Sequence, residues 1–208
     1  MSASLTGPPR AVLIGGTSHA GKSSLARELA DRVGYEPLST DKLARHPGRP
    51  WRQGEAPIPP HVVEHYATLA PEALIDSVLQ HYGRMWPMVR ALIETRVADP
   101  AAVGLVLEGS ALLPELAASM PGDRVAALWV HADEAVIEGR MRRESRYERA
   151  DPAERALIDA FLERTRRYQR LMLAAVTRLG LPSLEIGPRE PIEAVADRAL
   201  TLLGFDAA

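Results

Sequence analysis

The chain has 208 residues, 46% of them hydrophobic and 25% charged, with a formal net charge of −2 and no cysteine. This size and composition are typical of one globular domain, and the lack of cysteine excludes disulfides, thiolate metal sites and cysteine nucleophiles. The near-neutral charge argues against a dedicated nucleic-acid binder, and no apolar run reaches the roughly 18 residues that a membrane helix needs. The first ten residues lack a signal-peptide pattern, so we expect a cytoplasmic protein, monomeric or homodimeric, with no membrane partner.

Short apolar runs alternate with segments of helical periodicity along the chain. We expect strands over residues 11–14, 35–40, 103–107, 125–130 and 184–186, and helices over residues 23–33, 135–147, 153–179 and 191–203. Continuously apolar strands that are separated by helices predict a mostly parallel sheet with helices on both faces. The sequence therefore favours a single α/β domain over residues 1–208, built on a sheet of about five strands.

A long excursion, residues 44–98, separates the second and third expected strands. It opens with the proline-rich segment 46–60, which favours a stiff connector over a mobile lid, and continues as two or three helices. We expect interruptions at Pro71 and Pro87, because proline cannot donate a backbone hydrogen bond inside a helix. We interpret the excursion as a helical substrate-binding insertion. Basic residues near its start point to an anionic or polyhydroxylated ligand: Arg45, Arg49 and Arg52.

The first expected strand leads into GTSHAGKS, residues 16–23, which fits the phosphate-loop pattern G-x-x-x-x-G-K-[ST] at every fixed position. Glycines let backbone amides converge on phosphate oxygens, and the helix that follows directs its positive end toward them. We expect Lys22 to reach the β- and γ-phosphates of ATP, and the Ser23 hydroxyl to bind Mg²⁺. The nucleotide would be held by the whole run Gly16, Thr17, Ser18, His19, Ala20, Gly21, Lys22, Ser23 and Ser24.

The use of lysine supports this interpretation of the loop. Lys22 and Lys42 are the only lysines among 25 basic residues. A compact ammonium differs from the wide guanidinium fork, so a retained lysine indicates a position that arginine could not fill. We expect Lys22 to be exposed and to contribute little to fold stability. His19 occupies a variable position of the loop, where we expect it to face solvent rather than phosphate.

The segment STDKL, residues 39–43, follows the second expected strand. Asp41 would therefore lie at the carboxyl edge of the sheet, where ligands bind in open α/β folds. A carboxylate at that place can orient a hydroxyl that attacks the γ-phosphate, or accept its proton. The alternative is that Thr40 or Asp41 caps the N-terminus of a helix.

Three segments together resemble the P-loop small-molecule kinases: GGTSHAGKSS at 15–24, STDKL at 39–43 and LVLEGSALLP at 105–114. Within them the chain looks most like the 2-phosphoglycerate kinase-like group, with chloramphenicol phosphotransferase and zeta-toxin-type kinases as more distant relatives. The resemblance implies a three-layer α/β/α fold, Asp41 as the base for the acceptor hydroxyl, and Glu108 as an acidic residue that assists Mg²⁺ or substrate. The sequence departs from that group after Glu108, where a histidine is typical and Gly109-Ser110-Ala111-Leu112 stands instead.

An arginine-rich stretch follows the fourth expected strand. In the resembled kinases this segment is a mobile lid, which corresponds here to residues 138–152. The resemblance implies that Arg143 and Arg146 clamp the phosphates and that Arg140 lies beside the adenine. Helical spacing places Arg142, Arg146 and Arg149 on one face. The alternatives are a solvated helix whose arginines pair with nearby glutamates, and a nucleic-acid patch.

A second motif points to different chemistry. His61-Val-Val-Glu64-His65 fits H-x-x-E-H, in which two histidines one helical turn apart can bind Zn²⁺. His81 or Glu94 would have to supply a further ligand. We favour surface or substrate-pocket roles for these histidines over a zinc site.

The sequence thus predicts an enzyme that transfers the γ-phosphoryl group of ATP·Mg to a hydroxyl of a small molecule, either a metabolite or an antibiotic. One alternative is a kinase that acts on a nucleic-acid end or a nucleotide-sugar, although nucleic acid is not the partner we expect. Another is a nucleotide-dependent regulatory protein with little turnover.

Overall fold

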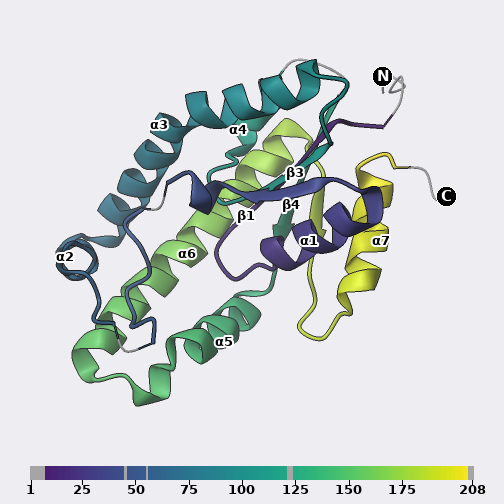
Figure 1. The fold of residues 1–208 in the computed structure, drawn as a ribbon. Coiled ribbons are helices and arrows are strands. Elements are labelled where there is room, and N and C mark those ends of the chain that lie inside the picture. Colours follow the sequence, from purple (N-terminus) through teal and green to yellow (C-terminus); the bar gives the residue numbers. More distant parts are fainter. Residues whose placement is uncertain (1–7, 45, 55, 121–123, 206–208) are drawn as a thin grey trace.

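The computed structural model describes residues 8–44, 46–54, 56–120 and 124–205, so Arg45 of the expected insertion lies outside the described residues. A five-stranded parallel sheet forms the centre, in the order β2-β3-β1-β4-β5 (Figure 1). The strands are β1 (Ala11–Gly16), β2 (Glu36–Ser39), β3 (Leu105–Glu108), β4 (Val125–His131) and β5 (Ser183–Glu185). The expected three-layer α/β class is confirmed, and each strand ends within two residues of its predicted bounds.

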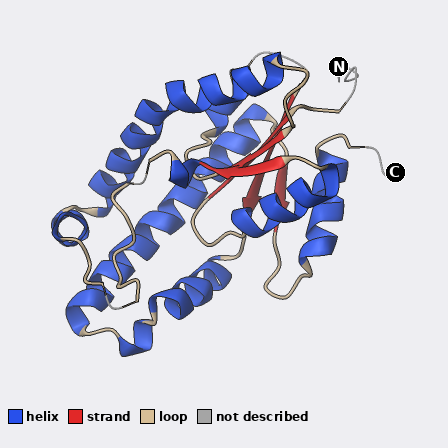
Figure 2. Cartoon of the chain, viewed as in Figure 1, coloured by secondary structure: helices blue, strands red, loops and turns tan. Residues whose placement is uncertain are grey.

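Helices cover both faces of this sheet (Figure 2). They are α1 (Lys22–Val33), α2 (Pro60–Thr68), α3 (Pro71–Ala98), α4 (Pro114–Ala118), α5 (Glu134–Ser145), α6 (Pro152–Leu179) and α7 (Ile192–Leu202). The short α4 was not predicted from the sequence. No helix in the described part of the chain is both long and apolar enough to cross a membrane.

Strand β1 is fully buried, and its successive side chains point to opposite faces of the sheet, so they contribute to two separate layers of the core. Val12 and Ile14 point to the face covered by α1 and α7, whereas Ala11 and Leu13 point to the face covered by α3, α4 and α6. Because β1 is covered on both sides and paired with β3 and β4, the loop that follows it is anchored at the centre of the sheet.

A third apolar cluster lies beyond the sheet, where α2, the start of α3, α5 and the first half of α6 meet (Figure 1). Trp51 and Tyr66 of the insertion pack there against Met141 of α5 and Phe161 of α6. The insertion and the arginine-rich helix therefore share one core, which forms the far side of the molecule from β5 and α7.

Helix α3 corrects one prediction. The chain breaks before Pro71 as expected, but it runs through Pro87 as a single helix. Buried side chains continue on both sides of Pro87, with Met85 and Trp86 before it and Val89 after it. Burying such side chains gives about 1.5–3 kcal/mol each, which outweighs the roughly 3 kcal/mol that an interior proline costs.

The arginine-rich helix is shorter than expected. Helix α5 ends at Ser145, because Arg146 adopts a left-handed conformation with φ 53°, and Tyr147–Arg149 form a separate 3₁₀ turn. The prediction that Arg142, Arg146 and Arg149 share one helical face is therefore wrong. The left-handed residue lets its N–H bond back to carbonyls of the last turn and so closes the helix.

Candidate functional site

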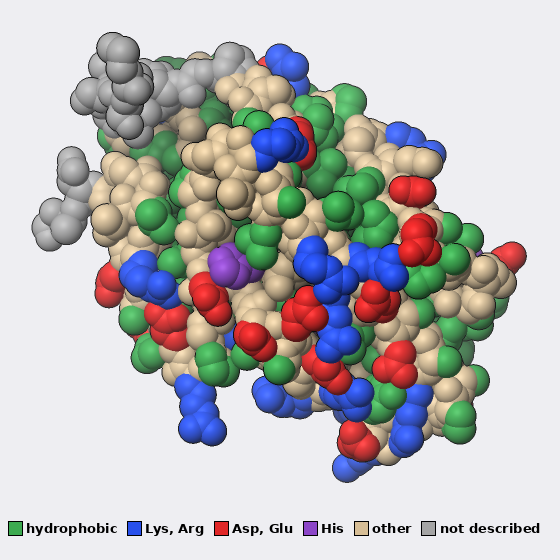
Figure 3. Space-filling model, turned by 180° about the vertical axis from the view of Figure 1, so that it is seen from behind, with side chains coloured by type: hydrophobic (Ala, Val, Ile, Leu, Met, Phe, Trp, Pro, Cys, Tyr) green, Lys and Arg blue, Asp and Glu red, His purple; other side chains and the backbone are tan. Residues whose placement is uncertain are grey.

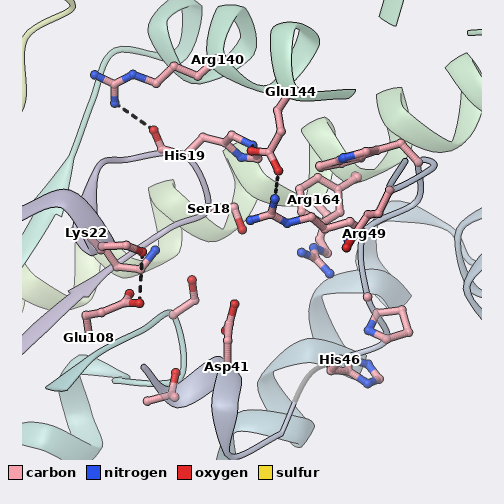
Figure 4. Close-up of a pocket in the computed structure, with 18 of the residues that line it drawn as sticks. Ser18, His19, Lys22, Asp41, His46, Arg49, Glu108, Arg140, Glu144 and Arg164 are labelled. Carbon is pink, nitrogen blue, oxygen red and sulfur yellow. Dashed lines mark hydrogen bonds and ion pairs between the residues drawn. The ribbon is translucent and has the colours of Figure 1, made fainter. Parts of the chain in front are cut away.

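Strand register brings three of the predicted residues to one edge of the sheet. Glu108, the last residue of β3, is paired with Ile14 of β1 on one side and with Ser39 of β2 on the other. The loop after β1 carries Lys22, and the turn after β2 carries Asp41. All three side chains line one cavity of about 950 Å³. Figure 4 shows them around its open space, with Arg49 and Arg164 on the opposite wall.

The loop after β1 has the conformation that phosphate binding needs. Gly16 and Gly21 have φ values of 145° and 108°, a region that favours glycine, and His19 is left-handed as well. A Cβ at Gly15 would overlap the indole of Trp129, and one at Gly16 would overlap the carbonyl of Val130. Among the described residues no side chain caps the N-terminus of α1, so its free N–H groups can receive an anion. The residues present therefore fit the phosphates of a nucleotide.

Lys22 is buried, which corrects the expectation of an exposed loop lysine. Its Nζ donates a hydrogen bond of 2.7 Å to the carbonyl oxygen of Thr17. Burial lowers the pKa of Lys22, and the carboxylates of Glu108 and Asp41 oppose that shift. The ammonium is thus held ready at the loop in a site that a phosphate anion would make more favourable.

Ser23 and Glu108 lie together beside Lys22. The Ser23 hydroxyl donates to Oε1 of Glu108 over 3.1 Å, and Glu108 is almost fully buried. A hydroxyl and a carboxylate are the hard oxygen ligands that Mg²⁺ prefers, with phosphate oxygens and waters completing its six positions. The described residues contain no cluster of three or more His, Cys, Asp or Glu that could hold a metal alone. The donor set therefore fits Mg²⁺ that arrives with a phosphate ligand.

Asp41 sits in a 3₁₀ turn, Thr40–Lys42, at the cavity wall. The capping residue of this turn is Ser39, whose Oγ accepts from the backbone N–H of Asp41 over 3.3 Å. The alternative that Thr40 or Asp41 caps a helix is therefore wrong. The exposed carboxylate of Asp41 points into the cavity (Figure 4).

His19 does not face solvent, contrary to our expectation, since its side chain is only 6% exposed. Burial and the nearby cations Arg49, Lys22 and Arg140 lower the pKa of His19 to about 4, so its ring is neutral near pH 7. Nε2 of His19 lies 3.0 Å from Glu144 of α5, to which a neutral ring can donate. Glu144 also forms an ion pair with Arg49 of the insertion. One carboxylate thus joins the phosphate loop, α5 and the insertion.

The arginines after β4 take different places. Arg140 donates to the carbonyl oxygen of His19 over 2.9 Å and to that of Gly187 over 3.5 Å, so it lies between the loop and the segment after β5. Arg143 is exposed and lines the cavity. Arg146 is exposed but lies outside the cavity wall, so its role in a lid stays a prediction. Arg142 pairs with Glu138 over 2.8 Å, which fits the solvated-helix alternative for that residue.

Sequence reasoning missed Arg164, in the first half of α6. Its exposure is 6%, and it lines the cavity with its Nη1 2.6 Å from the Tyr66 hydroxyl. The signal was present in the sequence, because Arg164 interrupts an apolar stripe that runs from Phe161 to Tyr168 and Met172. A charged residue on the buried face of an amphipathic helix needs a partner or a function.

The zinc alternative finds no support. His61 lies at the exposed mouth of the cavity, while His65 packs its ring against His46 with centroids 5.1 Å apart. His46 in turn stacks on His81 at 4.7 Å, an arrangement of rings rather than of ligands around one point. Of these histidines, His46 and His61 line the cavity, and the rings of His46, His65 and His81 pack together.

Comparison of the sequence with family models and with curated proteins finds no match. Solved structures are similar over nearly the whole chain. A sugar kinase from Janibacter sp. HTCC2649 is 22% identical with a TM-score of 0.53, over 95% of this chain and 97% of that one. A gluconokinase from Sinorhizobium meliloti 1021 is 21% identical with a TM-score of 0.50, over 94% and 91%.

A shikimate kinase from Acinetobacter baumannii in complex with shikimate is 14% identical with a TM-score of 0.51, over 95% of this chain and 93% of that one. At these identities the similarity shows the fold, which is the one found in P-loop small-molecule kinases. The 2-phosphoglycerate kinase-like subgroup stays a prediction.

Proposed function

We propose that this protein is an ATP-dependent phosphotransferase that moves the γ-phosphoryl group of ATP·Mg to a hydroxyl of a small molecule. The observation that carries the proposal is the meeting of the phosphate loop, Asp41 and Glu108 at one end of a 950 Å³ cavity. A cavity of this size can hold two ligands side by side. Structures of sugar, gluconate and shikimate kinases with the same fold support the same class of reaction.

The donor side of the site is built from the loop and β3. Backbone N–H groups at the start of α1 and the ammonium of Lys22 would hold the phosphates. Ser23 and Glu108 would hold Mg²⁺, which when bound neutralises charge that develops on the phosphate oxygens. Arg140, which bonds the loop and Gly187, would flank the nucleotide base, and Arg143, which lines the cavity, would reach the phosphates.

Asp41 would act on the acceptor. Its carboxylate takes the proton of the attacking hydroxyl while that oxygen forms a bond to the γ-phosphorus. The bond from phosphorus to the bridging oxygen breaks, and ADP leaves with Lys22 beside its terminal phosphate. The products are a phosphate monoester and ADP, with the released proton on Asp41.

A phosphate-transfer screen tests the proposal. We would incubate γ-labelled ATP and Mg²⁺ with pooled hydroxylated metabolites, antibiotics and oligonucleotides, using wild type, Asp41→Asn and, as a control, Asp31→Asn on the exposed side of α1. We expect a labelled small molecule whose formation falls about 10²–10⁴-fold in Asp41→Asn and is unchanged in the control.

Two results would contradict the proposal. Label on oligonucleotide ends alone would favour the nucleic-acid alternative. Free phosphate alone, or no turnover by a folded protein that binds ATP, would favour a nucleotide-dependent regulatory protein. A labelled product that does not require Asp41 would keep the reaction but overturn the assignment of the base.

A further inference from the structure

Arg164 is a buried cation with no anionic side chain beside it among the described residues. Within the described part of the chain its one hydrogen bond goes to the Tyr66 hydroxyl, and no carboxylate lies within ion-pair distance. Its guanidinium lies 4.4 Å from the ring centroid of Phe161 and 5.5 Å from that of Tyr66. Such ring contacts hold the side chain in place but do not neutralise its charge.

Other arginines on the same helix behave differently. Arg167 pairs with Glu163 and Glu72, Arg170 with Glu134, and Arg178 with Glu115. These pairs are at least partly exposed, and on the face seen in Figure 3 basic and acidic side chains are likewise interspersed. Desolvation makes a buried charge costly, so a buried arginine usually has a carboxylate partner. Here the surface arginines have such partners, and the buried Arg164 does not have one among the described residues.

The described residues around Arg164 offer it no negative charge. Burial raises the pKa of Tyr66 to about 12 and lowers the pKa of His46 to about 4, so both side chains are neutral near pH 7. The described carboxylates that line the cavity are Asp41, Glu108, Glu144 and Glu190. Glu108 bonds Ser23, Glu144 bonds His19 and Arg49, and Glu190 pairs with Arg198. Asp41 lies beyond ion-pair range of Arg164.

We propose that Arg164 binds an anionic group of the acceptor, so that the substrate is a hydroxylated small molecule that carries a carboxylate or a phosphate ester. This inference rests on the proposed function for the identity of the reacting hydroxyl. The guanidinium fork, held by Tyr66 and Phe161, presents its remaining donors to the cavity and can take two oxygens of one anion. The acceptor is thus anchored at Arg164 while its hydroxyl reaches Asp41.

Binding measurements with matched ligands test this. Mg·ADP at saturation fills the phosphate loop, and the protein is titrated with glycerol, glycerate and glycerol 3-phosphate, then with sorbitol, gluconate and sorbitol 6-phosphate. The acid or the ester of at least one set should bind wild type about tenfold to a hundredfold more tightly than its neutral member. Comparing acid with ester assigns the anion as carboxylate or phosphate.

The preference should disappear in Arg164→Gln and persist in Arg170→Gln, which lies on the same helix and removes only a surface pair. In the absence of ligand, Arg164→Gln should unfold at the same or a higher temperature, since it removes an uncompensated buried charge. A purely structural arginine would instead lower the unfolding temperature. Equal binding of neutral and anionic members, or a preference that survives Arg164→Gln, would overturn the inference.

The two proposals fail separately. An anion that binds through Arg164 but receives no label from ATP would contradict the phosphotransferase and support the anion site. A neutral acceptor that is phosphorylated with the same KM in wild type and Arg164→Gln would support the phosphotransferase and overturn the anion site.

Discussion

The two walls of the cavity are built in different ways. The wall formed by the phosphate loop and β3 has its charges matched before any ligand arrives: Lys22 bonds Thr17 and lies near Glu108, and Ser23 bonds Glu108. The opposite wall, formed by the insertion and α6, holds Arg164 with no counter-charge among the described residues.

This difference separates what each wall does. A wall whose polar groups already bond one another is suited to a ligand that is the same in every reaction, such as a nucleoside triphosphate with its metal. A wall with an unmatched charge gains most from one particular kind of ligand, because only an anion relieves its desolvation cost. Under the proposed function, the first wall would govern the chemistry and the second the choice of acceptor.

Among the variants that test the contrast between the two walls, Lys22→Ala should have the largest effect. Turnover should fall by about 10²–10³-fold or more, because under the proposed function the variant removes the ammonium that would hold the phosphates. The free energy of unfolding should not fall, since burial already disfavours the charged form of Lys22. Steady-state kinetics and urea unfolding of the same preparations measure both.

Lys42→Ala is the matched control, because Lys42 is the only other lysine of the chain and is exposed in the turn beside Asp41. It should leave turnover and stability close to wild type. A Lys22→Ala protein that unfolds much more easily would show that Lys22 serves packing, and the contrast between the walls would not hold.

A smaller effect is expected from Glu108→Gln. The amide still fits beside Ser23 but no longer attracts a cation, so the Mg²⁺ concentration for half-maximal turnover should rise about 10–100-fold. Magnesium titrations of wild type, Glu108→Gln and Glu64→Gln measure this. The last variant changes the acidic residue of the H-x-x-E-H segment and should behave like wild type. An unchanged Mg²⁺ requirement in Glu108→Gln would show that Glu108 does not help to bind Mg²⁺.

The last predicted effect concerns stability and pH at the junction of the walls. The pKa of His19 is about 4 in the folded protein against an ordinary 6.5, so the unfolded chain binds the additional proton between these values. The contribution of neutral His19 to the free energy of unfolding should therefore be fully present above pH 6.5. The free energy of unfolding should fall by on the order of 3 kcal/mol as the pH is lowered to 4. Urea unfolding at a series of pH values measures this slope.

His19→Asn isolates that contribution, because asparagine tolerates the left-handed conformation at this position. The slope between pH 6.5 and 4 should be shallower in the variant, while the part due to His46, whose pKa is also about 4, should remain. An identical slope in wild type and variant would show that His19 is not held neutral by the loop and Glu144.

The wall formed by the phosphate loop and β3 could be predicted from the sequence, because its residues are specified by their neighbours in the chain. Eight consecutive residues, 16–23, specify the loop, and strand ends supplied Asp41 and Glu108 without knowledge of distant contacts. The burial of Lys22 could not be foreseen, because it depends on how the loop folds back so that Nζ reaches Thr17.

The opposite wall, formed by the insertion and α6, depends on contacts between distant parts of the chain. Arg164 meets Tyr66 across 98 positions, and Glu144 meets His19 across 125, so no local pattern shows either pair. Helix α3 passes Pro87 for the same reason, since buried contacts with other elements outweigh the local preference of proline. The local clues to this wall were the basic residues at the start of the insertion, of which Arg49 lines the cavity, and the apolar stripe that Arg164 interrupts.

Glu144 gives the two walls a common contact, because it bonds His19 of the loop and Arg49 of the insertion at once. A ligand that moves either partner alters the strength of the remaining contact. Thermodynamic linkage then makes the influence reciprocal: the factor by which a nucleotide changes acceptor affinity equals the factor by which the acceptor changes nucleotide affinity. Cooperativity between two different ligands would thus arise from a single carboxylate, and a compound that occupies one wall would change the affinity measured at the other.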